Sequence, residues 1–370
     1  MRSFCGWYCL GGLIGILVCT RVGIAQPLIY NTFEDNDGTW LAMGPDAAVS
    51  RTHDDANVKE GHGALRFDYS VEQGSFGALV LATEAIDLSD LKSIKFWIKS
   101  DHAAPFGFVF QEKQEGRYIA TFWVPKDKWQ EVQLSPGDSI LSDLANGPKD
   151  PDGKLDLEKI QGVGIVDLSQ AFAQSDNAQL RKLFNVSPGP HTLYLDEFSA
   201  DTDALPKGEA LSEGQVAIDP FVHPQAGWMA VGESQISMDP FEAKLALCAE
   251  YHRLPGKLVG WIRPVAPGAL SNISKINIRC ASVRPAKLLV QVEETDGGKY
   301  RSVVDLAGGS RAQELSVELA GFQPSNDSND QNNKLDTELI KQVMIMDLTG
   351  MSLQAEDVNK IWISSITATK

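Results

Sequence analysis

The feature that most constrains how this 370-residue chain folds is an internal repeat. WLAMG, which begins at Trp40, recurs as WMAVG 188 residues later, beginning at Trp228. Longer matches stay in register within each segment, and their offset changes between segments, as insertions confined to loops would produce. The sequence therefore predicts two copies of one domain. The longer matches pair residues 88–100 with 270–282, 155–169 with 335–349, and 192–200 with 360–368.

A polar segment marks the boundary between the two copies. DTDALPKGEALSEG (201–214) contains a proline and two glycines and has no long apolar run, which is typical of a linker. We expect the first domain to span residues 26–200 and the second, more divergent domain to span 215–370. Both lengths lie within the normal range for one domain.

Apolar residues alternate with polar ones in most segments of each copy. In IKFWIK (94–99), Ile94, Phe96 and Ile98 lie on one face of the predicted strand, and Trp97 lies on the other face between two lysines. Glycines in EKQEGRY and EETDGGKY predict hairpin turns, whereas helical signals extend over a turn or two at most. Many short strands with almost no helix indicate an all-β protein of two tandem β-sandwiches.

The first 25 residues predict an export signal. Arg2 precedes an apolar run at 10–19, and Gly23-Ile24-Ala25 suits a signal peptidase. The run is shorter than the roughly 20 residues of a bilayer span, which disfavours a retained anchor. The residue before the last cysteine of the run is valine, whereas lipidation favours a small residue there. We therefore expect residues 1–25 to be a signal peptide, the mature protein to be periplasmic or extracellular, and no membrane span after signal removal.

Charge excludes one class of partner. Without residues 1–25 the chain has 31 basic and 49 acidic residues, a net charge of −18. Such a surface repels nucleic acid and anionic lipid and suits neutral or cationic partners or divalent ions. We expect no nucleic-acid binding.

Two cysteines remain in the expected mature chain, Cys248 and Cys280. The repeat aligns Cys280 with inward-facing Ile98 and Cys248 with outward-facing Arg66. Side chains on opposite faces of a sheet do not meet, so the pattern argues against a disulfide.

Six segments of the first copy follow one another in a recognisable order: FEDNDGTW, EGHGALRFDY, IDLSDLKSIKFWIKS, WVPKDKWQEVQL, LDLEKIQGVGI and LYLDEF. In this order the copy resembles galactose-binding-like jelly rolls, and most of all the family-eleven type of carbohydrate-binding module. The resemblance covers nearly all of 28–200 and, through the repeat, part of 215–370. It implies a jelly-roll form of the sandwich and a carbohydrate ligand, although the superfamily also includes domains that bind no sugar.

The resemblance also implies a structural calcium in the first domain. Related modules close their first and last strands around this ion with two acids, which correspond here to Glu34 and Asp196. The second copy has Val222 and Ser364 at these positions, and a joint loss is expected of two ligands of one ion. The alternative interpretation makes both acids strand-end residues that accept hydrogen bonds from backbone amides.

Two further polar segments are assigned no ligand. DPDGKLDLE (150–158) lacks the spacing of an EF-hand calcium loop and predicts a solvated turn. SNDSNDQNN (325–333) predicts a mobile polar loop without an assigned role.

Sugars present apolar ring faces edged with hydroxyls, so their sites combine exposed aromatic rings with planar polar groups. Trp97 and Trp123 have outward parity on their predicted strands, and Gln111 is expected to share that face on the neighbouring strand. The corresponding residues of the second copy are charged. We therefore expect these three side chains to bind a neutral polysaccharide or oligosaccharide. The alternative is that both tryptophans cover the sheet beneath a loop or the other domain.

Motifs of catalysis are absent from the sequence. It has no GxSxG, HExxH, phosphate loop or dinucleotide fingerprint, and its six histidines show no metal-ligand spacing. Two carboxylates suffice for a glycosidase, so a glycan-active enzyme stays an alternative. We expect a non-catalytic carbohydrate-binding protein. The rival from another class is a structural or protein-interaction module of the cell envelope, whose outward aromatic residues contact an envelope protein.

Overall fold

The structure, a computed structural model, describes residues 26–35, 40–113, 116–142, 150–176, 178–184, 186–223 and 227–370. The predicted signal peptide, residues 1–25, lies outside the described residues. In the part of the chain that the structure describes, no helix is long and apolar enough to cross a membrane.

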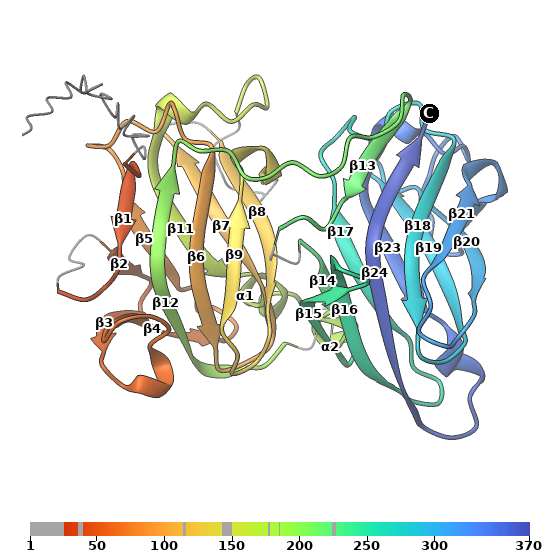
Figure 1. Cartoon of the computed structure of the whole chain (residues 1–370), viewed down its shortest axis with the longest axis horizontal. Coiled ribbons are helices and arrows are strands. Elements are labelled where there is room, and N and C mark those ends of the chain that lie inside the picture. The colour runs from red at the N-terminus through yellow and green to blue at the C-terminus, as the bar shows by residue number, and fades with distance from the viewer. Residues whose placement is uncertain are drawn as a thin grey trace, which may run out of the picture.

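Four antiparallel sheets form two sandwiches that lie side by side (Figure 1). The predicted all-β class and the tandem arrangement are confirmed. The first domain pairs sheet A with sheet B, and the second pairs sheet C with sheet D. In sheet A the order is β3 (Ala48–Thr52), β4 (Ala64–Val71), β12 (Gly189–Asp201), β6 (Ser93–Ser100) and β9 (Gln130–Leu134), with β1 (Ile29–Asn31) also on β12. In sheet B it is β10 (Ile140–Leu141), β8 (Arg117–Val124), β7 (Ala104–Glu112), β11 (Ile160–Asp167), β5 (Ala78–Ala82) and β2 (Trp40–Met43).

The second domain repeats this topology. Sheet C corresponds to sheet A and sheet D to sheet B. Among the described residues, α-helices occur only in the first domain: α1 (Ser169–Ala173) and α2 (Ala178–Leu183). In sheet C the order is β15 (Ser234–Phe241), β16 (Lys244–Arg253), β24 (Asp357–Thr369), β18 (Lys275–Ser282) and β21 (Gln313–Glu318), with β13 (Gln215–Asp219) also on β24. In sheet D it is β14 (Met229–Val231), β17 (Val259–Pro264), β23 (Ile340–Asp347), β19 (Ala286–Glu294), β20 (Lys299–Leu306) and β22 (Gln323–Pro324).

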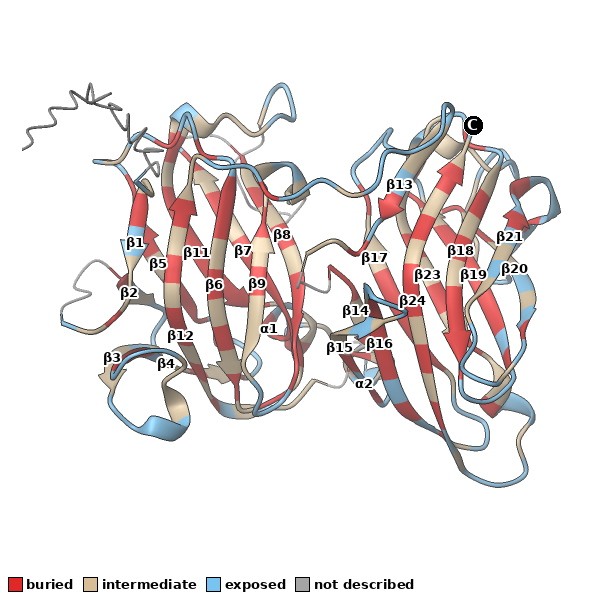
Figure 2. Ribbon diagram, viewed as in Figure 1, coloured by how far each residue is buried: buried red, intermediate tan, exposed pale blue. Residues whose placement is uncertain are grey.

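Each core lies between its two sheets, and buried residues alternate with more exposed ones along the strands (Figure 2). Phe96 and Ile98 of β6 face the first core, and Ile278 and Cys280 of β18 occupy the matching places in the second. This is the pattern that a period of two predicts for a strand with one buried face.

Polar pairs inside the two cores also repeat. The Tyr69 hydroxyl donates to Asp167 at 2.9 Å, and the Tyr251 hydroxyl donates to Asp347 at 2.6 Å. Both pairs join one sheet of a sandwich to the facing sheet. The tyrosine lies on β4 or β16, and the aspartate ends β11 or β23. Because a buried hydroxyl without an acceptor is costly, these bonds fix the same packing in both domains.

The two repeated tryptophans are buried and bonded in the same way. Trp40 donates its indole N–H to Asn31, and Trp228 donates to Asp219, each at 2.9 Å. Asp219 differs from Asn31 in carrying a charge, which Arg263 balances at 2.8 Å. The second domain therefore places an ion pair where the first has a neutral amide.

The domains pack against each other through apolar contacts. Strand β14 lies against β7 and β8, and Trp123 of β8 belongs to the core cluster of the second domain. A second contact is made by Phe184, just after α2, which packs with Val231 and Ile262. Between the domains, β12 ends at Asp201 and β13 begins at Gln215, and the residues between them form no helix or strand.

Cys248 and Cys280 are free thiols, as the sequence analysis predicts. Both are buried. Burial raises the pKa of Cys248 to about 11 and that of Cys280 to about 12, so both stay protonated at neutral pH.

Candidate functional site

The three side chains predicted to form one stacking surface do not share a face. Trp97 lies on β6 of sheet A, whereas Gln111 on β7 and Trp123 on β8 belong to sheet B. All three point away from the first core, but the outer faces of sheets A and B are on opposite sides of the sandwich. The prediction of a common surface is wrong because strand parity gives the direction of a side chain and not the sheet that carries it.

Trp123 is not an exposed platform. It is 2% exposed, because the second domain covers this end of sheet B. The position of Trp123 agrees with the alternative stated from the sequence, in which the other domain covers this tryptophan. Its indole N–H has no hydrogen-bond partner among the described residues.

Gln111 is half-buried and its amide is engaged locally. It donates to the carbonyls of Glu112 and Gly116 and accepts from Arg117 at 3.0 Å. These bonds close the hairpin between β7 and β8, so Gln111 has a structural role at this turn.

Trp97 is half-buried on the outer face of sheet A. Asp196 and Glu131 are its partners on the two neighbouring strands. The ammonium of Lys59 lies 4.1 Å from the ring centroid. A cation–π contact of this kind is worth about 0.5–1 kcal/mol when exposed, so a ligand stacking on that ring face would compete with Lys59.

Glu34 and Asp196, the predicted calcium ligands, hold the same turn. Asp196 accepts from the amides of Lys59 and Glu60 at 2.8 and 3.1 Å. Glu34 accepts from the amides of His62 and Gly63 at 2.9 and 3.3 Å. Asp196 is fully buried, and burial raises its pKa despite these bonds. The donor groups that surround the two acids are amide hydrogens, which matches the alternative interpretation given from the sequence.

This arrangement gives a second reason for the joint loss of both acids in the second domain. The turn belongs to the loop 53–63 between β3 and β4, whereas Glu242 and Ala243 alone connect β15 to β16. Without the loop, neither acid has amides to bind. The carbonyls of residues 33–35 are also engaged, since all three accept from the guanidinium of Arg51. The carboxylates of Glu34 and Asp196 and the carbonyls of residues 33–35 thus have hydrogen-bond partners without an ion. Calcium at Glu34 and Asp196 stays a prediction.

Two hollows lie where the second domain meets the first. One pocket of about 450 Å³ and another of about 340 Å³ share four lining residues. We call their union the interdomain groove. Its outer wall is the face of β15, β16 and β24, and Trp123, Pro125 and Lys128 line it from the first domain. The four shared residues are Gln235, Glu250, Tyr251 and His252.

The groove is lined by polar side chains of both signs above an apolar base. Gln235, Glu250 and His252 are exposed, whereas Trp123 and Tyr251 are buried beneath them. Glu250 lies 3.8 Å from Lys360, and His252 contacts Glu356 at 2.6 Å. The sequence analysis missed this site because it assigned no ligand to the second copy. The outward parity of these residues was the available signal, and it does not distinguish a groove from an open face.

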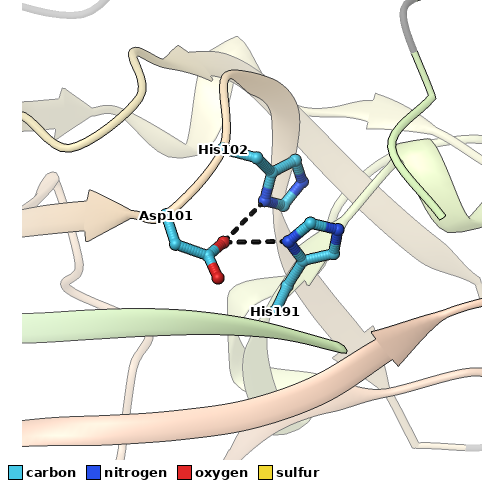
Figure 3. Close-up of side chains that lie close together, drawn as sticks. All are labelled: Asp101, His102 and His191. Atoms are coloured by element: carbon cyan, nitrogen blue, oxygen red, sulfur yellow. Dashed lines mark hydrogen bonds and ion pairs between the residues drawn. The ribbon is translucent and has the colours of Figure 1, made fainter. Parts of the chain in front are cut away.

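A network of Asp101, His102 and His191 lies beside the groove, next to Ala103 in its wall (Figure 3). Asp101 contacts the Nδ1 atoms of His102 and His191 at 3.1 and 2.9 Å. Asp101 and His102 are adjacent in the sequence, whereas His191 lies 90 residues after Asp101, which is why spacing in the sequence gave no sign of the network.

Each ring nitrogen of this network has a partner. The Nε2 atom of His102 contacts Asp167 at 2.9 Å, and the Nε2 atom of His191 donates to the carbonyl of Ser187 at 2.8 Å. A metal ion would have to displace these bonds. The three side chains therefore form a buried structural network, and a metal ion would bind there only by breaking its hydrogen bonds.

The network holds His102 in its charged form. Burial opposes the charge, but hydrogen bonds to Asp101 and Asp167 outweigh burial and raise the pKa of His102 to about 9. Asp101 shows the converse effect, because the two histidines hold its pKa well below its usual range despite partial burial. At neutral pH the network contains an imidazolium between two carboxylates.

Two antiparallel sandwiches in tandem define this chain as an all-β protein. The chain is similar to a family 11 carbohydrate-binding module from Clostridium thermocellum in complex with a β-1,3-1,4-mixed-linked tetrasaccharide. The identity is 16% and the TM-score 0.36, over 48% of this chain and 96% of the module. Family 11 modules are the type that the sequence analysis names.

Two further similarities concern a tandem pair and an enzyme. The CBM22-1–CBM22-2 tandem domain from Paenibacillus barcinonensis matches 94% of this chain and 98% of its own length, with 12% identity and a TM-score of 0.30. An exo-β-agarase matches 49% of this chain over 25% of its own length, with 14% identity and a TM-score of 0.32. No protein-family model matches the chain, and no curated protein matches it either. At these identities and TM-scores the similarities assign no ligand to this chain, and a ligand has to be inferred from the groove itself.

Proposed function

We propose that this chain is a non-catalytic carbohydrate-binding protein and that a neutral polysaccharide or oligosaccharide binds in the interdomain groove. The observation that carries the proposal is the lining of the groove: Gln235, Glu250 and His252 converge above the buried Trp123. Ligand sites occur preferentially at domain interfaces and combine an apolar base with a few polar groups. A sugar offers an apolar ring face and hydroxyls that both donate and accept.

The charges of the groove favour a neutral ligand. Glu233, Asp239 and Glu250 are acidic, and Lys128 and Lys360 are basic, so the lining has an excess of one negative charge, which is too small to select an ion. Hydroxyls bind carboxylates as donors and ammonium groups as acceptors. Open sites of this kind bind with a dissociation constant on the order of micromolar to millimolar, equivalent to about −8 to −4 kcal/mol.

Isothermal titration calorimetry of residues 26–370 against a polysaccharide panel tests the proposal. The panel includes mixed-linked β-1,3-1,4-glucan and xylan, the ligands named for similar modules. We expect Gln235→Ala and Glu250→Ala to weaken binding at least about tenfold, which is 1.4 kcal/mol. Trp97→Ala is the matched control on the opposite face and should bind normally.

The outcomes separate three readings. Binding that is lost in Trp97→Ala and kept in both groove variants would move the sugar site to the outer face of sheet A. Hydrolysis of a bound glycan would favour a glycan-active enzyme. No binding to any glycan, together with capture of one envelope protein, would favour the interaction module.

One observation favours that rival function. Leu41 and Met43 of the edge strand β2 and nearby Phe76 are about half exposed, at 57%, 54% and 48%. Exposed apolar side chains on a sheet edge are typical of a surface that another protein covers. Leu41→Ser with Met43→Ser should leave glycan binding unchanged and abolish binding to an envelope protein.

We also propose that the protein is exported. The signal peptide predicted at residues 1–25 supports this. N-terminal sequencing of the protein from the producing cells should find Gln26 as the first residue. An intact Met1 in the mature protein would contradict export by signal cleavage.

A further inference from the structure

A group of carboxylates lies at one end of the second domain, away from the interdomain groove. Glu294 ends β19, Asp296 is in the turn that leads to β20, and Asp330 is in the loop before β23. One carboxylate oxygen from each lies within 4.8 Å of the other two. The sequence analysis assigned no role to the loop that carries Asp330.

Glu294 is the unusual member of this group because it is 1% exposed. Its Oε1 atom accepts a hydrogen bond from the amide of Asp336. Its Oε2 atom is buried and has no hydrogen-bond partner among the described residues. A buried carboxylate oxygen without a donor carries an uncompensated desolvation cost.

The unpartnered oxygen points into the space between the three acids. A β-carbon placed on Gly298 would lie 1.7 Å from this Oε2 atom and 3.3 Å from the β-carbon of Asp330. The amide of the same glycine donates to Asp296 at 3.2 Å. Gly298 thus leaves room for Glu294 to turn toward the other two acids, and any larger residue would fill that place.

No lysine or arginine neutralises the group within the described part of the chain. The three lysines of this region pair with other acids: Lys299 with Asp327 at 2.7 Å, Lys334 with Asp336 at 3.6 Å, and Lys341 with Glu293 at 2.9 Å. The hydroxyl of Tyr300 donates to Asp330 and lowers the pKa of that acid, which keeps it charged. Burial, together with the charges of Asp296 and Asp330, raises the pKa of Glu294 to about 7.

We infer that Glu294, Asp296 and Asp330 form a binding site for a divalent cation, and that the cation is calcium. Three carboxylates supply hard oxygen ligands in a turn and a loop that can adjust to the irregular coordination that Ca²⁺ accepts. Mg²⁺ requires near-ideal octahedral geometry and gives up its water reluctantly, so a site of this kind selects against it. The cation would compensate the Glu294 oxygen that no donor reaches.

The first domain lacks one of the three ligands. Glu112 and Asp150 occupy the places of Glu294 and Asp330, and Tyr118 donates to Asp150 as Tyr300 does to Asp330. At the position of Asp296, however, the first copy has Gln114. The site is therefore expected in the second domain and not in the first, the reverse of the calcium predicted from the resemblance.

Calcium titration by calorimetry tests the inference on the full mature chain after treatment with a chelator. We expect one ion per chain, with a dissociation constant on the order of 10⁻⁴ M, as in extracellular modules. Asp296→Asn, a change in an exposed turn, should abolish the binding. Asp327→Asn is the matched control, because it removes one charge from the loop that carries Asp330 and leaves the three ligands in place.

A second variant separates a ligand role from a structural one. Glu294→Gln should bind calcium at least about tenfold more weakly. In chelator, however, it should melt at a higher temperature than the natural chain, because the new amide hydrogens can bond to Asp296 and Asp330. Absence of binding at 10⁻² M calcium, or equal binding by the natural chain and both ligand variants, would overturn the inference. Loss of binding in Glu34→Gln alone would move the ion to the first domain.

Discussion

The two domains bury the same acid beside cations of different kinds. In the first, Asp167 accepts from Tyr69 and contacts the imidazole of His102 at 2.9 Å. In the second, Asp347 accepts from Tyr251, and the guanidinium of Arg253 lies 3.7 Å away. The repeat thus preserved the acid and the tyrosine, which join the two sheets, while the cation came from a different position. A buried acid demands a partner, and more than one residue type satisfies that demand.

The difference between the cations has a chemical consequence. Arginine stays charged at every pH at which a protein is folded, whereas histidine can release its proton. The second domain should therefore keep its buried ion pair at every pH at which it is folded. The first domain should lose its ion pair at high pH. Four experiments test this contrast between the domains, from the largest effect to the smallest.

Removal of the cation from the second domain should have the largest effect. Arg253→Met leaves Asp347 buried without its cation and should lower the free energy of unfolding by about 3–5 kcal/mol. The loss should be the same at pH 6 and pH 9, since arginine keeps its charge at both. Urea unfolding followed by tryptophan fluorescence measures it. The control is Arg284→Met, whose side chain is 55% exposed and lies 3.8 Å from Asp357, with an expected cost of about 0–1 kcal/mol.

The first domain should lose stability as pH rises. The folded pKa of His102, about 9, is above its ordinary value of 6.5. Its charged contacts therefore contribute fully below pH 6.5 and are lost between pH 6.5 and 9, by up to about 3 kcal/mol. The groups that face the ring are Asp101, Asp167, His191 and Tyr69.

Thermal unfolding at half-unit pH steps measures this loss. His102→Gln should flatten the slope of the first domain over that window and leave the second domain unchanged. An equal slope in the variant and the natural chain would show that another group controls the pH dependence.

Loss of the hydrogen bonds between Asp196 and the loop 53–63 should have an intermediate effect that is confined to the first domain. Asp196→Asn replaces an acceptor of backbone amides and should cost about 1.5–3 kcal/mol, the value of hydrogen bonds to a charged group. Hydrogen exchange should accelerate at the amides of Lys59 and Glu60. The same variant tests calcium at Glu34 and Asp196: if a chelator lowers the melting temperature of the natural chain and not of Asp196→Asn, an ion binds there.

The smallest expected difference concerns the two repeated tryptophans. Trp228→Phe removes a bond to charged Asp219, whereas Trp40→Phe removes a bond to the neutral amide of Asn31. The first should cost about 1 kcal/mol more than the second, because hydrogen bonds to charged groups are stronger. The loss of ring area is the same in both variants, so their difference isolates the acceptor. Equal losses in chemical unfolding would contradict the role assigned to Asp219.

The fold was accessible from the sequence, and the candidate site was largely not. The alternation around Phe96 and the recurrence of Trp40 as Trp228 predict the strands and the two domains, because burial of one strand face repeats every two residues. The same alternation predicts that Trp97 and Trp123 point outward. It does not predict that they lie on opposite sheets of the sandwich. The amides that bind Asp196 could not be seen in the sequence at all, since every residue has one.

The sequence by itself determined the parts of this protein that depend on local periodicity: two all-β domains and their shared core positions. The tertiary structure decided what depends on contacts between distant segments. It buried Trp123 under the second domain, brought Gln235 and His252 to the interdomain groove, and left one oxygen of Glu294 unpartnered between Asp296 and Asp330. The reason is physical: a strand pattern fixes which side of a sheet is buried, whereas the neighbour of an outward side chain is set by how sheets, loops and domains pack.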